Sequence, residues 1–359
     1  MCEIEKEIVK KVGVDLELAT PKYLQVDNLA QIQFSNLKGV EVLSTKDALK
    51  KYDWLKKYFW KAVEKEKDEF TKFSAEHDFN GYFIRIGKNV KAKIPVQACL
   101  FLNTEGFIQN IHNIIIAEEN SEISIITGCT VASHKSGMHI GISEFFLEKN
   151  SKVNFTMIHA WNEETEVMPR TGAIVEKNAK FSSNYILLTP TKKLQMAPKI
   201  INLENSSSSL RSLLFGKKKS FVDVGGTIEF KGRNSSGIIQ SRVVAKEKAK
   251  VISRGEIVAE APETRGHIEC KGLILSNEAS IEAIPKLFSK NKKSELTHEA
   301  SVGKIRDEEL WYLMSRGLSE EEAVNLIMKG FLDPDFLEIP ENVKVQIRAI
   351  MEETKASRV

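Results

Sequence analysis

Hydrophobic residues in the first eighty positions follow a helical spacing. Between Thr45 and Ala75, apolar side chains recur every three or four residues, at Leu49, Tyr52, Leu55, Phe59, Trp60 and Val63. This spacing predicts amphipathic helices, each with one apolar face. We therefore expect residues 1–80 to form an N-terminal helical region that packs against the next part of the chain.

From about Gly81 the pattern changes to short β-branched runs separated by polar turns, which is typical of strands. A similar turn recurs at positions 121, 151, 179, 219, 249 and 279, with spacings of 30, 28, 40, 30 and 30 residues. Stacked coils produce such a period, because each unit buries its apolar face only against the next. The period predicts a mainly β fold with a parallel β-helix over residues 81–303. A meandering β-sandwich is the alternative.

Each repeat has room for two strands, such as Ile123–Thr130 and Ile140–Leu147. The long gap between positions 179 and 219 contains Thr189–Ser209. We expect its ten extra residues to form a loop that leaves one coil.

Helical patterns return near the C-terminus. Asp307–Arg316 begins with acidic residues, which favour a helix N-terminus, and Gly317 follows as a stop signal. Ser319 and Glu322 have the spacing of a capping box for a second helix. We expect residues 304–359 to form a C-terminal helical domain.

The composition of the 359-residue chain narrows the classes of function. The 52 Lys and Arg residues against 49 Asp and Glu give a net charge of only +3, which favours neither nucleic acid nor an anionic membrane as a partner. The four cysteines are too few for a disulfide scaffold. The N-terminus lacks the apolar core of a signal peptide, and no apolar run approaches the roughly 20 residues of a membrane span. We expect a cytoplasmic protein with reduced thiols.

The repeat places potential ligands in columns, because residues one period apart stack at about 4.8 Å. Cys99, Cys129 and His159 are spaced by 30 residues and are expected to form one column. Cys270 and His298 are 28 residues apart and should share a face in neighbouring coils, with Glu299 on the other side or at the end of the coil. Thiol, imidazole and carboxylate groups together are typical of an iron, zinc or sulfur site.

The same cysteines also fit a structural role. Cysteine is among the most buried residue types, and Cys99 lies in an apolar run typical of a core strand. For Cys129 and Cys270 the spacing alone leaves both roles open. The sequence has no CxxC pair, no phosphate-binding loop and no GxSxG elbow. We therefore do not expect a self-sufficient metal cage, a nucleotide site or a serine nucleophile.

The segment Thr297–Leu332 (THEASVGKIRDEELWYLMSRGLSEEEAVNLIMKGFL) resembles the C-terminal signature of the SufB/SufD family, the scaffold components of the Suf iron–sulfur cluster assembly machinery. The similarity extends back through Gly266–Pro285 and Gly128–Thr130, and so covers most of the chain. The resemblance implies a right-handed parallel β-helix between helical ends, in agreement with the period.

The resemblance also implies roles for individual residues. Cys270 matches the SufB-type cysteine, and His298 and Glu299 match the adjacent His-Glu pair, the proposed ligands of a transient Fe–S cluster. Cys129 matches the cysteine that accepts sulfur from a sulfur donor protein. A polar sulfur path inside the β-helix is implied at Asn103, His159, Trp161 and Lys177.

The resemblance implies partners as well. The family's C-terminal helices dock a SufC-type ABC ATPase, although much of this apolar stripe is also expected to pack internally. The implied docking residues are Leu310, Leu313, Met314, Leu326 and Phe331. SufB and SufD pair as a heterodimer. Because Cys270, His298 and Glu299 occur together here, we expect a homodimer, with a SufB/SufD-type heterodimer as the alternative.

Three functions are open, of which the resemblance implies the first two and the β-helix pattern suggests the third. The first is a scaffold, not an enzyme, that receives sulfur and iron and releases a cluster. The second is a SufD-like structural or iron-entry subunit without its own cluster, which Thr297 favours, since many SufB chains have Glu there. The third is a β-helix carbohydrate-active enzyme, which would carry a cleft of paired carboxylates that the sequence does not show. Participation of a flavin as reductant is left open.

Overall fold

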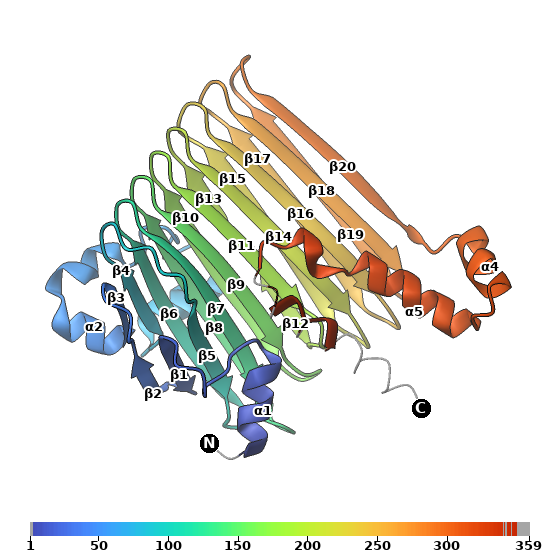
Figure 1. The fold of residues 1–359 in the computed structure, drawn as a ribbon, viewed down its shortest axis with the longest axis horizontal. Helices are drawn as coiled ribbons and strands as arrows, with labels where there is room; N and C mark the ends of the chain where they lie inside the picture. Colours follow the sequence, from blue (N-terminus) through green and yellow to red (C-terminus); the bar gives the residue numbers. More distant parts are fainter. Residues whose placement is uncertain (1–2, 340, 342, 346, 350–359) are drawn as a thin grey trace.

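The computed structural model describes residues 3–339, 341, 343–345 and 347–349. In this part of the chain, parallel strands stack coil upon coil into two facing walls (Figure 1). The main core lies between the walls, because each strand directs every second side chain inward. The predicted mainly β fold and parallel β-helix are confirmed.

The strands of each wall are hydrogen-bonded in a constant order. In the first wall the order is β2 (Leu29–Phe34), β1 (Lys22–Val26), β5 (Val96–Leu102), β7 (Glu122–Val131), β9 (Lys152–Ala160), β11 (Lys180–Leu187), β14 (Ser207–Gly216), β16 (Ser236–Ala245), β18 (Arg265–Ile274) and β20 (Glu295–Lys304). In the second wall it is β3 (Val40–Ser44), β4 (Tyr82–Ile86), β6 (Phe107–Ala117), β8 (Gly137–Leu147), β10 (Glu166–Val175), the pair β12 (Lys193–Met196) and β13 (Lys199–Asn202), β15 (Phe221–Phe230), β17 (Lys250–Ala259) and β19 (Ser280–Ser289). The labelled α-helices are α1 (Glu3–Lys11), α2 (Thr45–Lys51), α3 (Glu69–Glu76), α4 (Asp307–Ser315) and α5 (Glu320–Phe331), and short 3₁₀ helices cover Asp53–Tyr58 and Pro334–Phe336. The described residues 341, 343–345 and 347–349 are also helical.

Stacked apolar side chains hold neighbouring coils together. Ile123 of β7 stacks on Val153 of β9, and Ile125 stacks on Phe155. All four belong to the buried core between the walls. Each coil therefore buries its inner row against the next coil, as the period predicts.

Asparagines form a ladder along one rim of the β-helix. Asn120, Asn150 and Asn178 have φ angles of 60°, 61° and 60°, which asparagine adopts more readily than most residues. The Asn178 side chain donates a hydrogen bond to Asn150, and the Asn150 side chain donates one to Asn120, each at 2.9 Å. The recurring Asn of the turn motif is thus explained by both its backbone conformation and its stacking.

The predicted loop at Thr189–Ser209 is wrong. This segment contains a turn, β12, β13, a second turn and the start of β14, and Lys180 of β11 stacks on Ser207 without an insertion. Positions 121, 151 and 179 lie where the chain passes from the second wall to the first, whereas 219, 249 and 279 lie at the opposite rim. Both rims use polar turns with positive φ, at Asn178 and Lys218 for example, so their sequences look alike.

The first eighty residues are helical only in part. They also contain β1, β2 and β3. β2 and β3 run antiparallel to β1 and β4, and so end the parallel stack at its N-terminal end. The helical spacing over Thr45–Ala75 corresponds to α2, a 3₁₀ helix and α3, with an irregular segment before α3.

A buried carboxylate explains the irregular segment. Glu144 of β8 accepts hydrogen bonds from the backbone N–H groups of Trp60, Ala62 and Val63 at 2.6, 2.7 and 3.1 Å. Its other contact is with Nε2 of His112 at 2.8 Å, and both of these side chains are fully buried. N–H groups that bind a carboxylate are not available to helical carbonyls, so the chain lies irregularly over the second wall.

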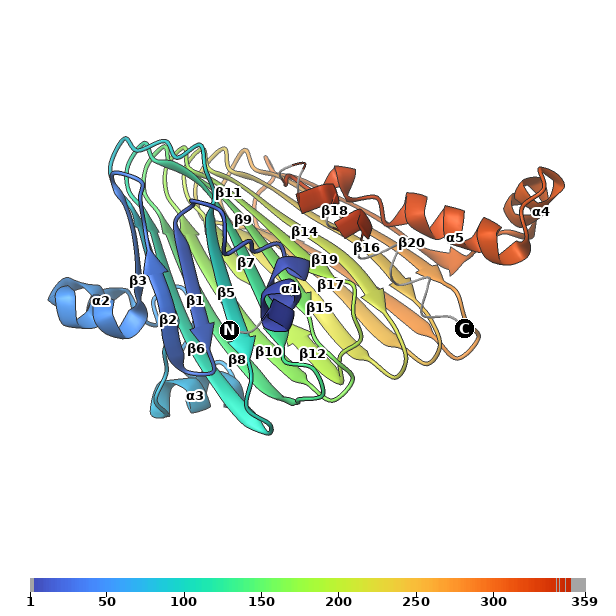
Figure 2. The same cartoon turned by 60° about the horizontal axis from the view of Figure 1, so that its bottom comes forward.

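Helices follow the last strand, as the sequence predicts. Gly317 has a φ of 95° just after α4, and Ser319 and Glu322 form the capping box of α5. α4 projects beyond the last coil, and α5 runs back along the first wall, where Met328 and Phe331 pack (Figures 1 and 2). Residues 350–359 of the predicted C-terminal helical domain lie outside the described residues. None of the helices in the described part has the length and apolar character that a bilayer crossing needs.

The two ends of the β-helix differ. Antiparallel strands close the N-terminal end. At the C-terminal end, the residues of β19 and β20 are exposed or only half-buried on both faces. The inner residues Ile281 and Leu296 pack only partly buried against the core, and no described strand pairs with the outer edge of β19 or β20, so this end of the β-helix is open.

Candidate sulfur and metal sites

Three potential ligands meet inside the β-helix near one rim. Cys129 of β7 stacks directly on His159 of β9, and His139 of β8 faces them from the second wall. The thiol of Cys129 and one ring nitrogen of each histidine lie within 4.8 Å of one another, and all three side chains are buried. The predicted pairing of Cys129 with His159 is therefore confirmed, and His139 joins them.

Hydrogen bonds orient both imidazole rings. Nδ1 of His139 lies 2.7 Å from Oε1 of Gln109, and Nδ1 of His159 lies 2.9 Å from the hydroxyl of Tyr185. Burial lowers the pKa of His139 to about 3 and that of His159 well below its usual value, so both rings are neutral near pH 7. A neutral imidazole offers a lone pair to a metal ion or a proton.

Cys99 does not belong to this group, and its predicted place in the column is wrong. β5 pairs Cys99 with Gly128 and Leu100 with Cys129, so Cys99 faces outward, beneath α1 (Figure 2). A register shift of one residue reverses the face of every side chain on a strand. Burial raises the pKa of both thiols, which are therefore protonated in this structure.

Two predicted path residues lie near Cys129. The Trp161 ring centroid is 5.1 Å from that of His139 and 5.4 Å from that of His159. Asn103 lies in the turn after β5, at the same rim, and its backbone N–H donates to Asp27 Oδ1 at 2.8 Å. The structure thus brings Trp161 into the buried cluster and places Asn103 at its border.

Lys177 does not join this cluster. It lies in the turn before β11, whereas His159 stacks on Leu187 at the end of that strand. The two residues are therefore at opposite rims. The Lys177 ammonium group is half-exposed and pairs with Glu204 at 3.0 Å. An ion pair at the surface accounts for this lysine.

A row of polar side chains leads from the cluster toward Cys270. Along the inner face of the first wall, Tyr185 stacks on Ser212, Ser212 on Ser241, and Ser241 on Cys270. Ser253 of the second wall lies 2.7 Å from Ser241 and 3.9 Å from the Cys270 sulfur. Five strand steps of about 4.8 Å separate β7 from β18, so the two cysteines are about 24 Å apart along the axis.

Cys270 lies one coil below the open end. Its side chain is buried beneath Ala300 of β20, which is itself exposed. His298 lies opposite Ile268, on the same face as Cys270, with the Cα atoms of the two ligands about 8 Å apart. Glu299 faces the outer side. The spacing prediction holds for the faces of both His298 and Glu299. Among the described residues, the inner face of the last coils brings together Cys270 and His298.

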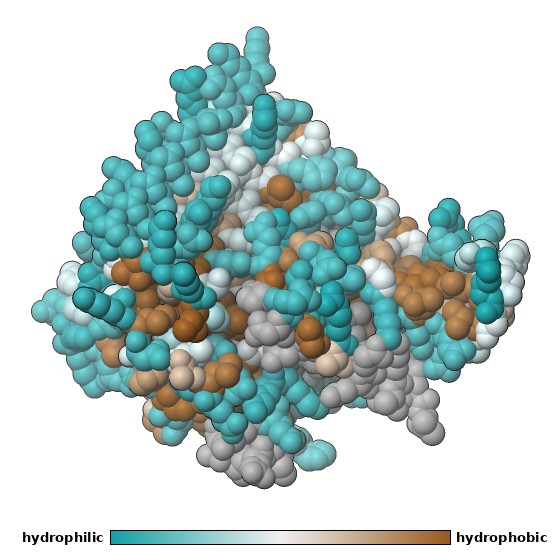
Figure 3. Space-filling model, in the orientation of Figure 1, coloured by the Kyte–Doolittle hydropathy of each residue, from teal (hydrophilic) through white to brown (hydrophobic). Residues whose placement is uncertain are grey.

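Apolar side chains of α4 and α5 are exposed to solvent (Figure 3). Of the predicted docking residues, Met314 is 40% exposed and Leu326 is 50% exposed, and Trp311 beside them is 65% exposed. The other predicted docking residues are only partly exposed: Leu310, Leu313 and Phe331. Phe331 packs against the core beside the first wall. The predicted stripe is thus divided between an exposed patch and internal packing.

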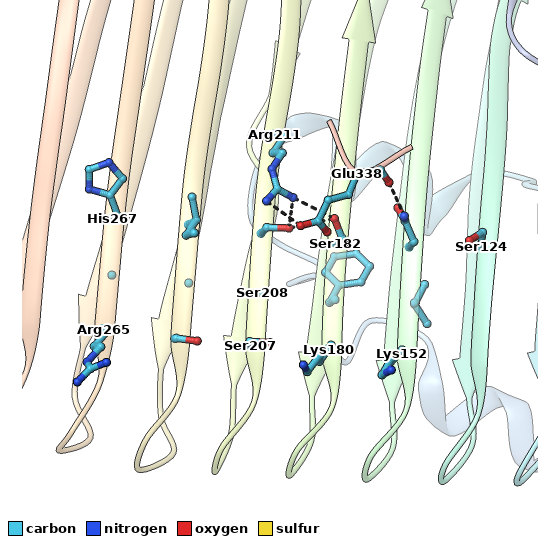
Figure 4. Close-up of a pocket in the computed structure, with 18 of the residues that line it drawn as sticks. Ser124, Lys152, Lys180, Ser182, Ser207, Ser208, Arg211, Arg265, His267 and Glu338 are labelled. Atoms are coloured by element: carbon cyan, nitrogen blue, oxygen red, sulfur yellow. Dashed lines mark hydrogen bonds and ion pairs between the residues drawn. The ribbon is translucent and has the colours of Figure 1, made fainter. Parts of the chain in front are cut away.

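A groove of about 860 Å³ on the outer face of the first wall is a further candidate (Figure 4). Its floor carries serines such as Ser182 and Ser209, with basic residues at its rim. Arg211 in this groove pairs with Glu338 at 2.9 Å, and Asn154 donates to the carbonyl of Glu338. These polar groups hold the segment after α5, and none of the described lining residues is a cysteine.

His139, Gln109 and Tyr185 are the site residues that the sequence patterns missed. Two of them lie on the second wall and therefore share no column with Cys129. The sequence of β8 nevertheless indicates the direction of His139. His139 and Gly141 are an even number of residues from Phe145, which faces the core, and so lie on the same face of the strand. Because alternate side chains of a strand point to the same face, steps of two residues back from Phe145 place His139 inside the core.

Comparison with known proteins identifies the family of this chain. The family model described as "SUF system FeS cluster assembly, SufBD core domain" matches residues 100–331, from β5 to the end of α5. A protein of Archaeoglobus fulgidus described as an iron-sulfur cluster assembly SufBD family protein is 46% identical over 351 residues, which are 97% of this chain and 95% of that protein.

Two further relatives carry the same description. One from Methanothermobacter thermautotrophicus is 40% identical over 98% of this chain and 88% of its own length. One from Pyrococcus horikoshii is 38% identical over 88% of this chain and 71% of its own length. The family model covers well over half of the chain, and the relatives span nearly all of it. The chain therefore belongs to the SufBD family of iron–sulfur cluster assembly proteins.

Proposed function

We propose that this chain is a cytoplasmic scaffold, without catalytic turnover of its own, on which an iron–sulfur cluster is assembled from sulfur and iron. The cluster is its cargo, not a resident cofactor. The observation that supports this most strongly is the position of Cys270, one coil below an open end and on the same face as His298. Thiolate and imidazole are both known cluster ligands, and an open end allows a finished cluster to leave.

Sulfur enters, in this proposal, at Cys129. Its thiol is buried, so a sulfur donor protein can reach it only when the rim near Trp161 opens. Burial lowers the pKa of both histidines and raises that of the Cys129 thiol, so the two rings are poor acceptors for the thiol proton. Water admitted by the opening takes up that proton, and the thiolate then attacks the outer sulfur of the donor's persulfide while the donor's own thiolate leaves. The polar row lines the way to Cys270 at Tyr185, Ser212 and Ser241.

The cluster site is completed by a second copy of the chain. In the described part of one chain, Cys270 and His298 are the two ligands on the inner face at this end, whereas Fe–S clusters normally have four protein ligands. No described strand pairs with the outer edges of β19 and β20, which leaves the backbone groups of these edges and a half-buried apolar row for a partner. Two open ends joined about a twofold axis cover these edges and double the ligand set. A SufB/SufD-type heterodimer is the alternative arrangement.

Anaerobic reconstitution with iron and sulfide tests the scaffold proposal. Cys270→Ser is expected to lose most of the cluster, measured as iron and sulfide per chain and by Mössbauer spectroscopy, because serine supplies no soft thiolate. Cys99→Ser is the matched control, since Cys99 is equally buried but faces outward on β5. It should reconstitute like the unaltered protein.

A cluster that survives Cys270→Ser would contradict the scaffold proposal. It would favour the second function, a SufD-like structural or iron-entry subunit. If the Cys270→Ser protein keeps its cluster and the Cys129→Ser protein loses it, Cys129 would instead be identified as the cluster ligand.

We also propose that α4 and α5 dock a SufC-type ABC ATPase, which would supply the ATP-driven step. The exposed patch of Trp311, Met314 and Leu326 is apolar and lies at one end of the molecule (Figure 3). Replacing Trp311 and Met314 with aspartate is expected to abolish co-purification with the ATPase, because charge in a buried apolar interface is unfavourable.

Aspartates at Ile94 and Ile108 are the matched control. These side chains are 40% and 42% exposed, close to the value of Met314, and lie outside α4 and α5. The control should keep the ATPase. Equal co-purification of both double variants would refute the docking proposal.

A further inference from the structure

The buried cluster around Cys129 has the geometry of a metal site as well as that of a sulfur acceptor. We propose that Cys129, His139 and His159 bind a divalent cation of borderline softness, such as Zn²⁺ or Fe²⁺, inside the β-helix. This site is separate from the cluster position at Cys270, about 24 Å away along the axis. It stands whether or not Cys129 also accepts sulfur.

The three ligand atoms are nearly in place. They lie within 4.8 Å of one another, and a tetrahedral zinc ion with bonds of 2.0 to 2.3 Å holds its ligand atoms about 3.5 Å apart. Side-chain rotations that move each atom by about 1 Å therefore close the site. One thiolate and two imidazoles form a ligand set that zinc and ferrous iron both accept, with the fourth position open.

The hydrogen bonds of His139 show which ring nitrogen is free. The Gln109 amide nitrogen donates to the carbonyls of Asp27 and Phe101 at 3.0 and 3.2 Å, which turns its oxygen toward His139. That oxygen accepts only from a protonated Nδ1, at 2.7 Å. Nε2 of His139 therefore carries a lone pair. Fixing a ligand histidine through its other nitrogen is the usual arrangement around a bound metal.

His159 is oriented in the same way. Its Nδ1 lies 2.9 Å from the hydroxyl of Tyr185, and its Nε2 is buried with no hydrogen-bond partner among the described residues. A buried nitrogen without a partner is unfavourable in a folded core. A metal ion bound to Nε2 would supply the missing partner.

Space and a further unpaired donor support the same site. A side chain at Gly141 would place its Cβ 2.9 Å from Nε2 of His139, so glycine keeps this nitrogen accessible. The indole N–H of Trp161 is also buried without a partner among the described residues. It stands beside both histidine rings, where it can donate to a water molecule in the fourth position.

A bound cation and a sulfur atom would compete for the same thiolate. Cys129 is protonated without metal, because burial raises its pKa, and metal binding displaces this proton. While the cation is bound, the sulfur lone pairs are engaged, and Cys129 cannot attack a persulfide. Occupancy of this site would therefore block sulfur loading.

Zinc and cobalt loading without iron or sulfide tests the inference. The unaltered protein, refolded anaerobically with Zn²⁺, should retain one ion per chain after gel filtration, and Co²⁺ should show a thiolate-to-cobalt charge-transfer band. His139→Gln is expected to lower Zn²⁺ affinity by about 100-fold or more. Tyr185→Phe removes only the hydrogen bond to His159 and should lower it by about 10-fold.

Cys99→Ser is the control and should bind Zn²⁺ like the unaltered protein, because Cys99 faces outward on β5. If His139→Gln does not fold, the Cys129→Ser protein tests the site instead, because without the Cys129 thiolate it should lose the thiolate-to-cobalt charge-transfer band. No retained zinc in the unaltered protein, or unchanged affinity in His139→Gln, would overturn the inference. Because iron and sulfide are absent, this failure is distinct from a failure of cluster assembly at Cys270.

Discussion

Glu144→Gln is expected to lower the free energy of unfolding by about 4 kcal/mol. The carboxylate accepts hydrogen bonds through both oxygens, from Trp60 N–H and His112 at one, and from the N–H groups of Ala62 and Val63 at the other. Glutamine has nearly the same shape, but its NH₂ group must face N–H donors on one side. Buried donors then lose their acceptor, which is among the costliest single changes in a core.

Urea denaturation followed by circular dichroism measures this loss. Glu204→Gln is the matched control, because Glu204 is half-exposed and its ion pair with Lys177 lies at the surface of the rim. It should change stability by less than about 0.5 kcal/mol. A Glu144→Gln protein as stable as this control would show that the segment before α3 does not depend on the carboxylate.

Aspartates at Leu296 and Val302 are expected to convert the proposed dimer into monomers. Both residues lie on the inner face of β20, and Val302 is 40% exposed at the open end. Two charges per chain in the centre of an apolar interface would weaken association by at least about 1,000-fold. Size-exclusion chromatography with light scattering, under anaerobic reducing conditions, measures the change.

The control for this prediction carries aspartates at Ile108 and Ile238. These residues are 42% and 38% exposed, similar to Val302, but lie away from the last coil. The control should remain dimeric. A monomeric unaltered protein, or a Leu296/Val302 variant that still dimerises, would exclude the open end as the interface.

The β-helix was predictable because its physical cause is local. Inward apolar residues such as Ile123 and Phe155 repeat with the coil, and the period is visible in the sequence. The error over Thr189–Ser209 arose because both rims use polar turns with positive φ, so turn chemistry does not tell one rim from the other. Only strand pairing, such as Lys180 with Ser207, distinguishes them.

The candidate sites were predictable where stacking determines them. Cys129 and His159 share a column because β7 and β9 pair with an offset of 30 residues. Cys99 does not share that column, because β5 and β7 pair with an offset that is one residue shorter. Cys99 therefore lies beside Gly128, and its side chain points to the outer face. His139 comes from the opposite wall, and contacts across the core depend on the width and closure of the coil, which no sequence spacing contains.

The polar row also has a geometric consequence. Each coil touches only its neighbours, so the separation of Cys129 from Cys270 changes only in whole strand steps of about 4.8 Å. Relatives that gain or lose one complete coil between them would keep the parity of every inward side chain while lengthening or shortening the internal route. The number of coils therefore sets the distance between the proposed sulfur entry at Cys129 and the proposed cluster site at Cys270. This distance can change without any change in the residues of either site.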